Sequence, residues 1–404
     1  MINFMNVEDA GDGEVQSSET STTVIKVVGV GGAGGNAVEH MIREGVGGVE
    51  FICCNTDAQA LAKSSAHVTL QLGPGLGAGG KPEKARELAQ ADRERIAQVL
   101  TGANMVFITA GMGGGTGTGA GPVVAEVARE LGILTVAVVT KPFEYEGRRK
   151  RLAEEGVAEL AKHVDSLIVI LNEKLEEVLG DEVTMLDAFK AADNVLRNAV
   201  GGIAEIINVP GLVNVDFEDV RTVMGEMGKA MMGSASAAGV DRARIAAEAA
   251  VASPLLEGIE LSGARGVLVN ITASTTLGLK EYKEVMATIR QYTAAEATVI
   301  CGAVFDETME DQLRVTVVAT GLGGAAAKVR KPEMKVVETI GMRTGTDNYP
   351  VFEAVTSSAV GTDLTGVIAG RGANRTPSGN QANAMADAGI DKYDIPAFLR
   401  RQVD

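Results

Sequence analysis

Short apolar runs alternate with stretches of helical periodicity between residue 24 and about residue 180 of the chain. The runs predict strands at residues 24–30, 49–54, 67–72, 105–110, 133–140 and 166–171. The periodic stretches predict helices at residues 36–44, 57–63, 83–101, 120–131 and 147–162. Because strands that alternate with helices pair in parallel through right-handed crossovers, we predict a doubly wound, Rossmann-type α/β domain over residues 23–182.

A longer apolar periodicity runs over residues 183–208 and ends before Pro210 and Gly211. As one helix it would reach roughly 39 Å, enough to cross the whole domain. A second α/β region follows, with helices predicted near 217–228 and 241–251 and strands near 265–273, 296–305 and 312–320. We interpret these strands as near-antiparallel hairpin partners, although the pattern leaves the topology open.

The two ends of the chain differ in composition from its middle. Residues 1–22 are rich in Ser, Thr, Asp, Glu and Gly, which predicts a disordered extension. Residues 321–390 predict a flexible linker, and residues 391–404 end in an apolar peptide. The predicted domains are therefore 1–22, 23–182, a central helix at 183–209, a C-terminal domain at 210–320, the linker 321–390 and the peptide 391–404.

Two glycine-rich loops each stand between a predicted strand and a predicted helix. The first is GVGGAGGN, Gly29 to Asn36, and the second is GGGTGTG, Gly113 to Gly119. Glycine lets backbone N–H groups approach an anion, and a helix N-terminus favours the same negative charge. A pair of such loops on neighbouring strands suits a polyphosphate, so we predict a nucleoside triphosphate site. We interpret five glycines in seven residues of the second loop as more than structure alone requires.

The first loop by itself also fits a dinucleotide site. Gly29, Gly31 and Gly34 satisfy the G-x-G-x-x-G pattern, and Asp57 stands where an NAD ribose would need an acidic residue. This leaves an NAD(P)-linked oxidoreductase as an alternative, but the second loop has no place in that scheme. A nucleotide-binding module that does not polymerise is a further alternative.

Three other places carry candidate chemistry. Phe189 and Asp193 are four residues apart, on one helix face, which suits a stacked guanine with its N–H groups bound; a core Phe beside a solvated Asp fits equally well. Residues 144–151, EYEGRRKR, offer ribose and phosphate contacts or only an exposed helix start. Asp216 and Asp219 follow the long helix; Asp216 is a good N-cap, yet such carboxylates could also orient water on another molecule's γ-phosphate.

Charge and cysteine content exclude several classes of protein. The net charge of −16 argues against nucleic-acid binding, and it implies that a nucleotide needs backbone amides and Mg²⁺. Three cysteines, Cys53, Cys54 and Cys301, do not suggest a disulfide framework. The chain shows neither a signal-peptide pattern nor an apolar run of about 18 residues. We therefore expect a cytosolic protein without membrane insertion.

Three segments in combination resemble the FtsZ family, the bacterial cell-division homologues of tubulin. They are GGGTGTG, the loop of Asn214, Asp216 and Asp219, and the terminal DIPAFLRRQVD from Asp394. The resemblance covers about residues 24–320 and the final 14. It implies a tubulin-like GTPase domain, a central helix, a smaller α/β domain, a flexible tail, and head-to-tail filaments at the mid-cell division site. It also implies GTP/GDP with Mg²⁺, and membrane-linked division adaptors that bind Asp391–Asp404.

The same resemblance assigns roles to individual residues, with no metal ligand from a side chain. The phosphate side takes Gly31, Gly32, Ala33, Gly113, Gly114, Gly115, Thr116, Gly117, Thr118, Gly119 and Thr140. The guanine side takes Asn36, Phe189 and Asp193, and the ribose takes Glu146. Lys150 stands where relatives often carry an arginine near the γ-phosphate. Asn214, Asp216 and Asp219 would act on the GTP of a neighbouring subunit.

Overall fold

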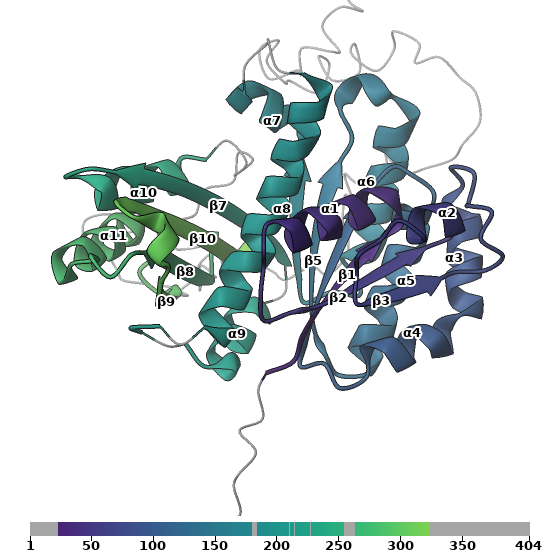
Figure 1. Ribbon diagram of the computed structural model, residues 1–404, viewed down its shortest axis with the longest axis horizontal. Coiled ribbons are helices and arrows are strands. Elements are labelled where there is room, and N and C mark those ends of the chain that lie inside the picture. The colour runs from purple at the N-terminus through teal and green to yellow at the C-terminus, as the bar shows by residue number, and fades with distance from the viewer. Residues whose placement is uncertain are drawn as a thin grey trace, which may run out of the picture. The chain divides into compact units, whose positions relative to one another are not determined.

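One continuous sheet organises the chain. In the computed structural model, which describes residues 23–179, 184–209, 211–213, 215–226, 228–253 and 263–322, ten strands lie in the order β3-β2-β1-β4-β5-β6-β7-β10-β8-β9 (Figure 1). The first six are β1 Ile25–Val30, β2 Glu50–Asn55, β3 Val68–Gln71, β4 Met105–Gly111, β5 Leu134–Lys141 and β6 Ser166–Leu171. All pairs among these six are parallel. The predicted strands and the parallel sheet are therefore confirmed.

The second half continues the same sheet with mixed pairing. Its strands are β7 Gly228–Ala238, β8 Gly266–Ala273, β9 Thr298–Phe305 and β10 Gln312–Leu322. β7 pairs in parallel with β6 over three residues, and β10 is antiparallel to both β7 and β8. β8 and β9 pair in parallel, so the prediction of hairpin partners is wrong for them. The reason is α11, Leu279–Tyr292, which supplies the crossover that parallel neighbours need.

The helices agree with the sequence pattern in the middle of each element and differ at the ends. They are α1 Gly31–Arg43, α2 Ala58–Leu61, α3 Pro82–Ala91, α4 Arg93–Leu100, α5 Thr116–Glu130, α6 Arg148–Leu160, α7 Asn172–Leu179, α8 Met185–Asn208, α9 Phe217–Met224 and α10 Arg242–Val251. The single helix predicted over 83–101 is two helices that meet at Asp92, whose carboxylate accepts from Gly73 N at 2.8 Å. α1 and α5 begin several residues earlier than predicted, within the glycine loops, because tertiary packing there overrides the low helix propensity of glycine.

Among the described strands and α-helices, β7, α7 and α11 were not predicted from the pattern. β7 reads GKAMMGSASAA, without the β-branched residues typical of a strand. Its conformation depends on β10 beside it and on close packing of α10, since a Cβ at Gly233 would lie 1.9 Å from the carbonyl oxygen of Ala250. Small residues permit this approach, and no local sequence pattern signals it.

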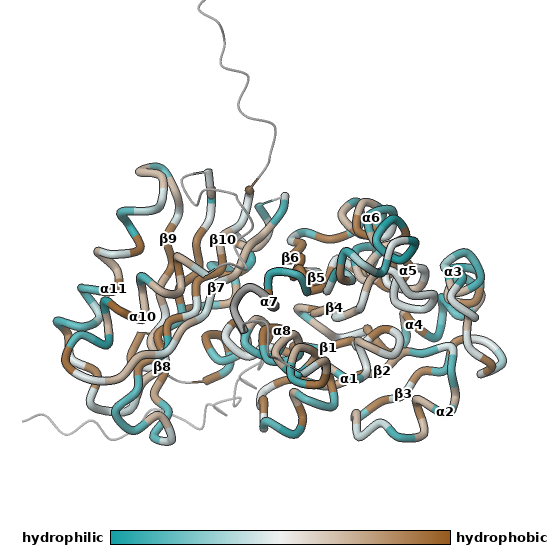
Figure 2. Tube along the Cα trace, turned by 90° about the horizontal axis from the view of Figure 1, so that it is seen from above, coloured by the Kyte–Doolittle hydropathy of each residue, from teal (hydrophilic) through white to brown (hydrophobic). Residues whose placement is uncertain are grey.

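The parallel half buries both faces of its strands. Ile25 and Val27 pack with α1 and α8, whereas Val28 and Val30 pack with helices on the opposite face. Figure 2 shows the strands between α1 and α8 on one side and α3, α5 and α6 on the other. The burial of both faces explains why the strand segments read as continuous apolar runs instead of alternating ones.

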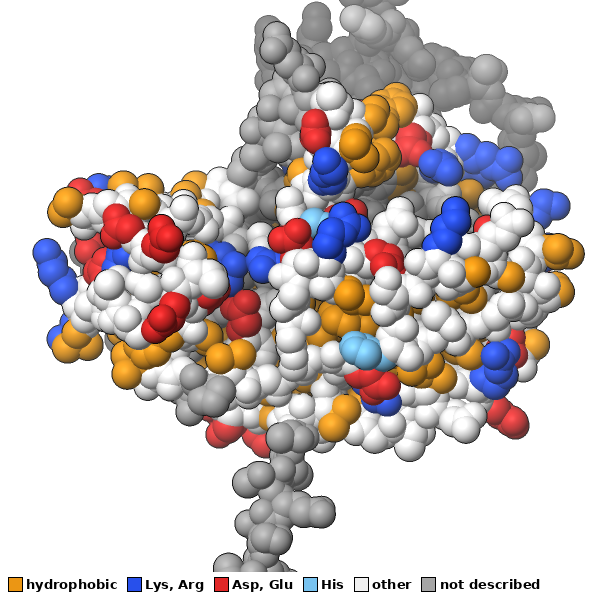
Figure 3. All heavy atoms as spheres, viewed as in Figure 1, with side chains coloured by type: hydrophobic (Ala, Val, Ile, Leu, Met, Phe, Trp, Pro, Cys, Tyr) orange, Lys and Arg blue, Asp and Glu red, His pale blue; other side chains and the backbone are white. Residues whose placement is uncertain are grey.

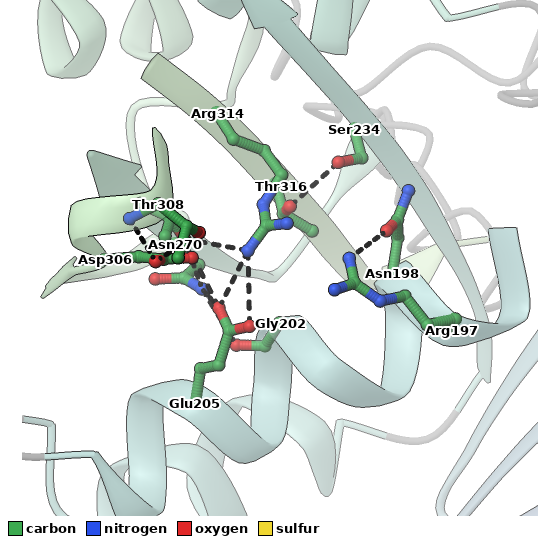
Figure 4. A network of polar contacts seen from close by, with 11 residues as sticks. Arg197, Asn198, Gly202, Glu205, Ser234, Asn270, Asp306, Thr308, Arg314 and Thr316 are labelled. Carbon is green, nitrogen blue, oxygen red and sulfur yellow. Dashed lines mark hydrogen bonds and ion pairs between the residues drawn. The ribbon is translucent and has the colours of Figure 1, made fainter. Parts of the chain in front are cut away.

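α8 joins the two halves of the sheet. Its buried side includes Leu196, Val200 and Ile203, which belong to a core shared with β8 and β10. On the same side Glu205 accepts from Arg314 of β10 at 3.1 Å and from Asn270 of β8 at 3.2 Å (Figure 4). This partly buried ion pair fixes the position of the helix against the second half.

A buried lysine caps the C-terminal end of α4. Lys26 of β1 is 8% exposed, and its Nζ donates to the carbonyl oxygens of Val99 at 2.8 Å and Thr101 at 3.2 Å. The same Nζ pairs with Glu50 at 3.2 Å. Because the last carbonyls of a helix have no partner within it, the ammonium group satisfies acceptors that burial would otherwise leave unpaired.

We expect Lys26→Met to lower the free energy of unfolding by about 1–3 kcal/mol, the range for leaving buried polar groups unpaired. Methionine keeps the apolar stem and removes only the ammonium group. Chemical denaturation measures the change, with Lys280→Met on the exposed side of α11 as the control. A loss no larger than that of the control would contradict the role given to Lys26.

Candidate nucleotide site

A cavity of about 710 Å³ opens at the carboxyl ends of β1, β4, β5 and β6. Val30, Gly111 and Thr140 line it from the ends of three of these strands, and Asn172 lines it from the residue that follows β6. Ligands of open α/β sheets bind at this edge. The volume lies within the range of small-molecule sites.

Two helices begin at the wall of this cavity without a side-chain cap. Gly32, Ala33 and Asn36 line it from α1, and Gly114–Gly117 line it from the start of α5. Neither helix has an acidic residue in its first turn or a side chain that accepts from its free N–H groups. Both therefore present unpaired donors and a partial positive charge to the same space, which suits a polyphosphate.

Close packing explains the glycines of the first loop. Gly31 has φ +77°, and a Cβ there would lie 2.9 Å from Gly117 N. A Cβ at Gly34 would lie 2.4 Å from the carbonyl oxygen of Thr109 in β4, and one at Gly29 would lie 2.5 Å from that of Gly34. Gly32 has nothing within 4 Å of its Cβ position, so its open side faces the cavity.

The second loop corrects an inference from the sequence. A Cβ would lie 2.7 Å from Arg149 O at Gly113, 3.0 Å from Ala78 at Gly115, 2.6 Å from Gly111 O at Gly117 and 2.0 Å from Pro82 O at Gly119. Packing alone therefore requires Gly113, Gly117 and Gly119 and favours glycine at position 115, contrary to our interpretation of the loop. Only Gly114 has open space around its Cβ position, and it lines the cavity.

The two threonines of this loop lie differently. Thr116 lines the cavity, and its Oγ1 is 2.7 Å from Oγ1 of Thr56. Thr118 is buried and accepts from Gly113 N at 2.9 Å. Gly31, Gly113, Thr118 and Gly119 are not among the residues that line the cavity, so they shape the loops around it.

Asn36 of α1 and Phe189 and Asp193 of α8 also line the cavity. Burial raises the pKa of Asp193 to about 6, and the nearby His40 and Arg43 offset part of this rise. Phe189 is 48% exposed and meets Phe143 edge to face at 6.3 Å. The structure thus brings together an exposed ring face and a carboxyl group held in a poorly solvated position.

The segment after β5 places Glu146 and Arg149 in the cavity wall. Glu146 accepts from Phe143 N at 3.1 Å and pairs with Arg149 at 2.6 Å. Lys150 does not line the cavity and forms an ion pair with Glu144. Its side chain leaves α6 on a different side from that of Arg149, so the arginine is the cation that reaches the cavity.

The sequence pattern missed several lining residues, of which Asn172 is the most informative. It is 7% exposed, and its Oδ1 has no hydrogen-bond partner among the described residues. Its place directly after β6 was the available signal, because the carboxyl ends of parallel strands share one edge. The other missed residues that we note are Met112, Pro142 and Met185.

Hydrophobic side chains are exposed around the mouth of the cavity. Tyr145, Met185, Leu186 and Phe189 are between 48% and 69% exposed. Figure 3 shows hydrophobic side chains gathered near the upper ends of α8 and α6, with Lys and Arg beside them. Exposed apolar surface rimmed by charge is typical of a protein interface.

Comparison with known proteins decides the family. Residues 24–180 match the GTPase domain of the Tubulin/FtsZ family, and residues 228–323 match the C-terminal domain of the FtsZ family. The cell division protein FtsZ of Pseudomonas aeruginosa is 53% identical over 97% of this chain and 100% of its own length. The chain belongs to the FtsZ family. It is a GTPase of cell division, and the oxidoreductase alternative is excluded.

Two further relatives agree with this assignment. FtsZ of Pseudomonas putida is 53% identical over 97% of this chain and 100% of its own length. A solved FtsZ dimer of M. jannaschii is 44% identical, with a TM-score of 0.72, and covers 75% of this chain and 89% of its own. The tubulin-like fold is thereby confirmed. Asp57, the residue that suggested NAD, caps α2 by accepting from Gln59 N at 2.9 Å.

In this FtsZ-family chain the acidic residues lie at the other edge of the sheet. Asp216 is the N-cap of α9 and accepts from Asp219 N at 2.7 Å; both residues are exposed. α9 contacts the amino ends of the strands, where Arg221 donates to Gly132 O just before β5. Gly132 and Thr140 are separated by the length of β5, roughly 26 Å. Asn214 lies outside the described residues.

Among the described residues, no group of three or more His, Cys, Asp or Glu side chains is placed to hold a metal ion. No helix in this part of the chain combines the length and hydropathy needed to cross a bilayer.

We expect Gly119→Ala and Gly114→Ala to separate folding from binding. Overpacking against Pro82 should cost Gly119→Ala about 1–3 kcal/mol of unfolding free energy. Gly114→Ala has room in the ligand-free protein, so its stability should change by less than about 0.5 kcal/mol while its GTP affinity falls. Thermal unfolding without nucleotide and a GTP titration measure the two effects. Equal destabilisation of both variants would contradict this division.

Proposed function

We propose that the chain polymerises head to tail and that the loop of Asn214, Asp216 and Asp219 completes the GTP site of the next subunit. The observation that carries the proposal is the position of the cavity and of α9 at opposite edges of one sheet. No motion within a subunit brings groups together across the length of β5. A second copy, stacked along the strand direction, would place its α9 over the cavity of the first.

Other features support assembly through this surface. The exposed hydrophobic residues around the cavity would be covered by the neighbour. Leu212 and Val213, close to α9 in sequence, are also exposed, at 63% and 38%. The M. jannaschii relative was solved as a dimer. Stacking of this kind joins two different surfaces and therefore produces open filaments.

We assign each residue of the cavity a part of the nucleotide according to its position. The free N–H groups of α1 and α5 would bind the phosphates, with Thr116 and Arg149 beside them. Asp193 and Asn36 would bind the guanine edge, and Phe189 would cover the base. Glu146 would accept from the ribose. We add Asn172, whose unpaired Oδ1 needs a donor that a nucleotide supplies.

Mg²⁺ fits this donor set as a partner of the phosphates. Since no cluster of three ligating side chains is present among the described residues, most of its ligands would come from phosphate oxygens and water, as is usual for Mg²⁺. When bound, it would neutralise charge on the phosphates. Asp216 and Asp219 would orient the attacking water, and the α5 amides would stabilise charge that develops on the γ-phosphate.

The remaining predictions concern the cell. We propose that the protein acts in the cytoplasm at the mid-cell division site, with residues 321–390 as a linker and Asp391–Asp404 as a peptide that binds membrane-linked adaptors. Ile395, Phe398 and Leu399 at i, i+3 and i+4 support a short helix for a partner groove. The domain boundaries 1–22, 23–182, 183–209 and 210–320 are proposed on the same sequence grounds.

The raised pKa of Asp193 predicts a pH dependence of GTP affinity. Guanine N–H groups require the ionised carboxylate, which in the empty site forms only as pH rises through about 6. Affinity should therefore be constant above pH 7 and fall by up to about tenfold per unit below pH 6. Calorimetric titrations between pH 5 and 8 measure it. The control is Asp193→Asn, whose remaining pH dependence belongs to the phosphates; identical profiles would disprove the role.

Asp216→Asn tests completion of the site by a neighbour. Asparagine caps a helix as well as aspartate does, so α9 keeps its N-cap and loses only the charge. We expect GTP binding and filament mass to be retained and turnover per assembled subunit to fall by at least tenfold. In mixtures with the wild type, turnover should track the fraction of interfaces with a wild-type α9. Unchanged turnover in filaments of pure Asp216→Asn would refute the proposal.

A further inference from the structure

Two buried hydroxyl groups hold the C-terminal end of α9, one from each half of the sheet. Ser166, the first residue of β6, donates to the carbonyl oxygen of Met224 at 2.6 Å. Thr320 of β10 donates to the carbonyl oxygen of Val223, also at 2.6 Å. Ser166 and Thr320 are both 0% exposed. Because the last carbonyls of a helix have no partner within it, these hydroxyls satisfy acceptors that water cannot reach.

Gly266, the first residue of β8, makes room for one of these contacts. A Cβ there would lie 2.7 Å from Thr320 Oγ1, 3.0 Å from Val223 Cγ1 and 3.2 Å from Val223 O. Gly266 is not among the glycines with positive φ, so its backbone does not require glycine. The absence of a side chain at this position is explained by the approach of Thr320 to α9.

The buried C-terminal end of α9 and its acidic N-terminal end move as one rigid unit. The helix has eight residues and is about 12 Å long. Val220, Val223 and Met224 are at most 1% exposed, whereas Asp216 and Asp219 stand exposed at the opposite end. A two-turn helix does not bend appreciably, so any axial shift of its buried end displaces the acidic residues by a similar amount.

We propose that Ser166 and Thr320 are positioning residues for GTP hydrolysis. Through the carbonyls of Val223 and Met224 they set the axial position of α9, and with it the distance that Asp216 and Asp219 project toward a neighbouring subunit. Neither residue touches the cavity, so their effect is on the site of the next subunit and not on their own. The inference rests on the proposed completion of the site between subunits.

The test compares Thr320→Val with two matched variants of β10. Thr320→Val removes the hydroxyl and keeps the shape, and Thr320→Ser retains the hydroxyl. Thr316→Val removes another buried hydroxyl of β10, which bonds Ser234 at 2.9 Å and does not contact α9. Three quantities are measured for each: GTP affinity of the subunit, sedimented filament mass, and turnover per assembled subunit.

For Thr320→Val we expect unchanged GTP affinity and filament mass, with turnover about tenfold or more below wild type, since small misplacements of reacting groups have large effects on rate. Thr320→Ser should recover most of the turnover, and Thr316→Val should keep it. Ser166→Ala and Gly266→Ala should reproduce the loss, and they carry the test if Thr320→Val does not fold.

Two results would overturn the inference: equal loss of turnover in Thr316→Val and Thr320→Val, or full turnover in both Thr320→Val and Ser166→Ala. A failure of the proposed function is recognised separately, since Asp216→Asn would then hydrolyse GTP normally. If Asp216→Asn is inactive while the hydroxyl variants are fully active, completion by the neighbour stands and only the positioning role is lost.

Discussion

The parallel pairing of β1–β6 is the constraint on which the rest of the structure depends. It places every strand's carboxyl end at one edge, where the glycine loops follow, and every amino end at the other, where α9 packs. A sheet that is hydrogen-bonded throughout and buried on both faces cannot shorten to bring these edges together. Chemistry that needs groups from both edges therefore needs two molecules, which is why we connect hydrolysis with assembly.

Several polar groups of the cavity lie in surroundings that are unfavourable to them. The carboxyl group of Asp193 is desolvated, Asn172 Oδ1 is buried without a partner in the described part of the chain, and two helices begin without side-chain caps. The pKa of Asp193 is higher in the folded protein than in the unfolded chain. Its contribution to the free energy of unfolding therefore decreases as the pH rises from about 4 to about 6. In the binding mode that we propose, GTP supplies a hydrogen-bond partner to each of these groups.

Much of this architecture could be predicted from local pattern. The six parallel strands were predicted from their runs of apolar residues, and α8 was predicted from its long apolar periodicity. Both signals are visible without knowledge of the tertiary structure. β7, α7 and α11 were not predicted. The small residues of β7 depend on their neighbours for their conformation, whereas α7 and α11 are amphipathic helices whose apolar spacing was overlooked. The role of glycine in GGGTGTG was misjudged because Gly113 and Gly119 pack against Arg149 and Pro82, which are distant in sequence.

The sequence by itself determined which segments are strands and helices, where the glycine loops stand, and that Asp216 begins a helix. Each of these depends on interactions within a few residues. Only the tertiary structure decided that Arg149 and not Lys150 reaches the cavity, that Asn172 lines it, and that hydroxyls of Ser166 and Thr320 hold α9. These depend on side-chain direction and on contacts between residues far apart in the chain, which the spacing of residues along a sequence does not encode.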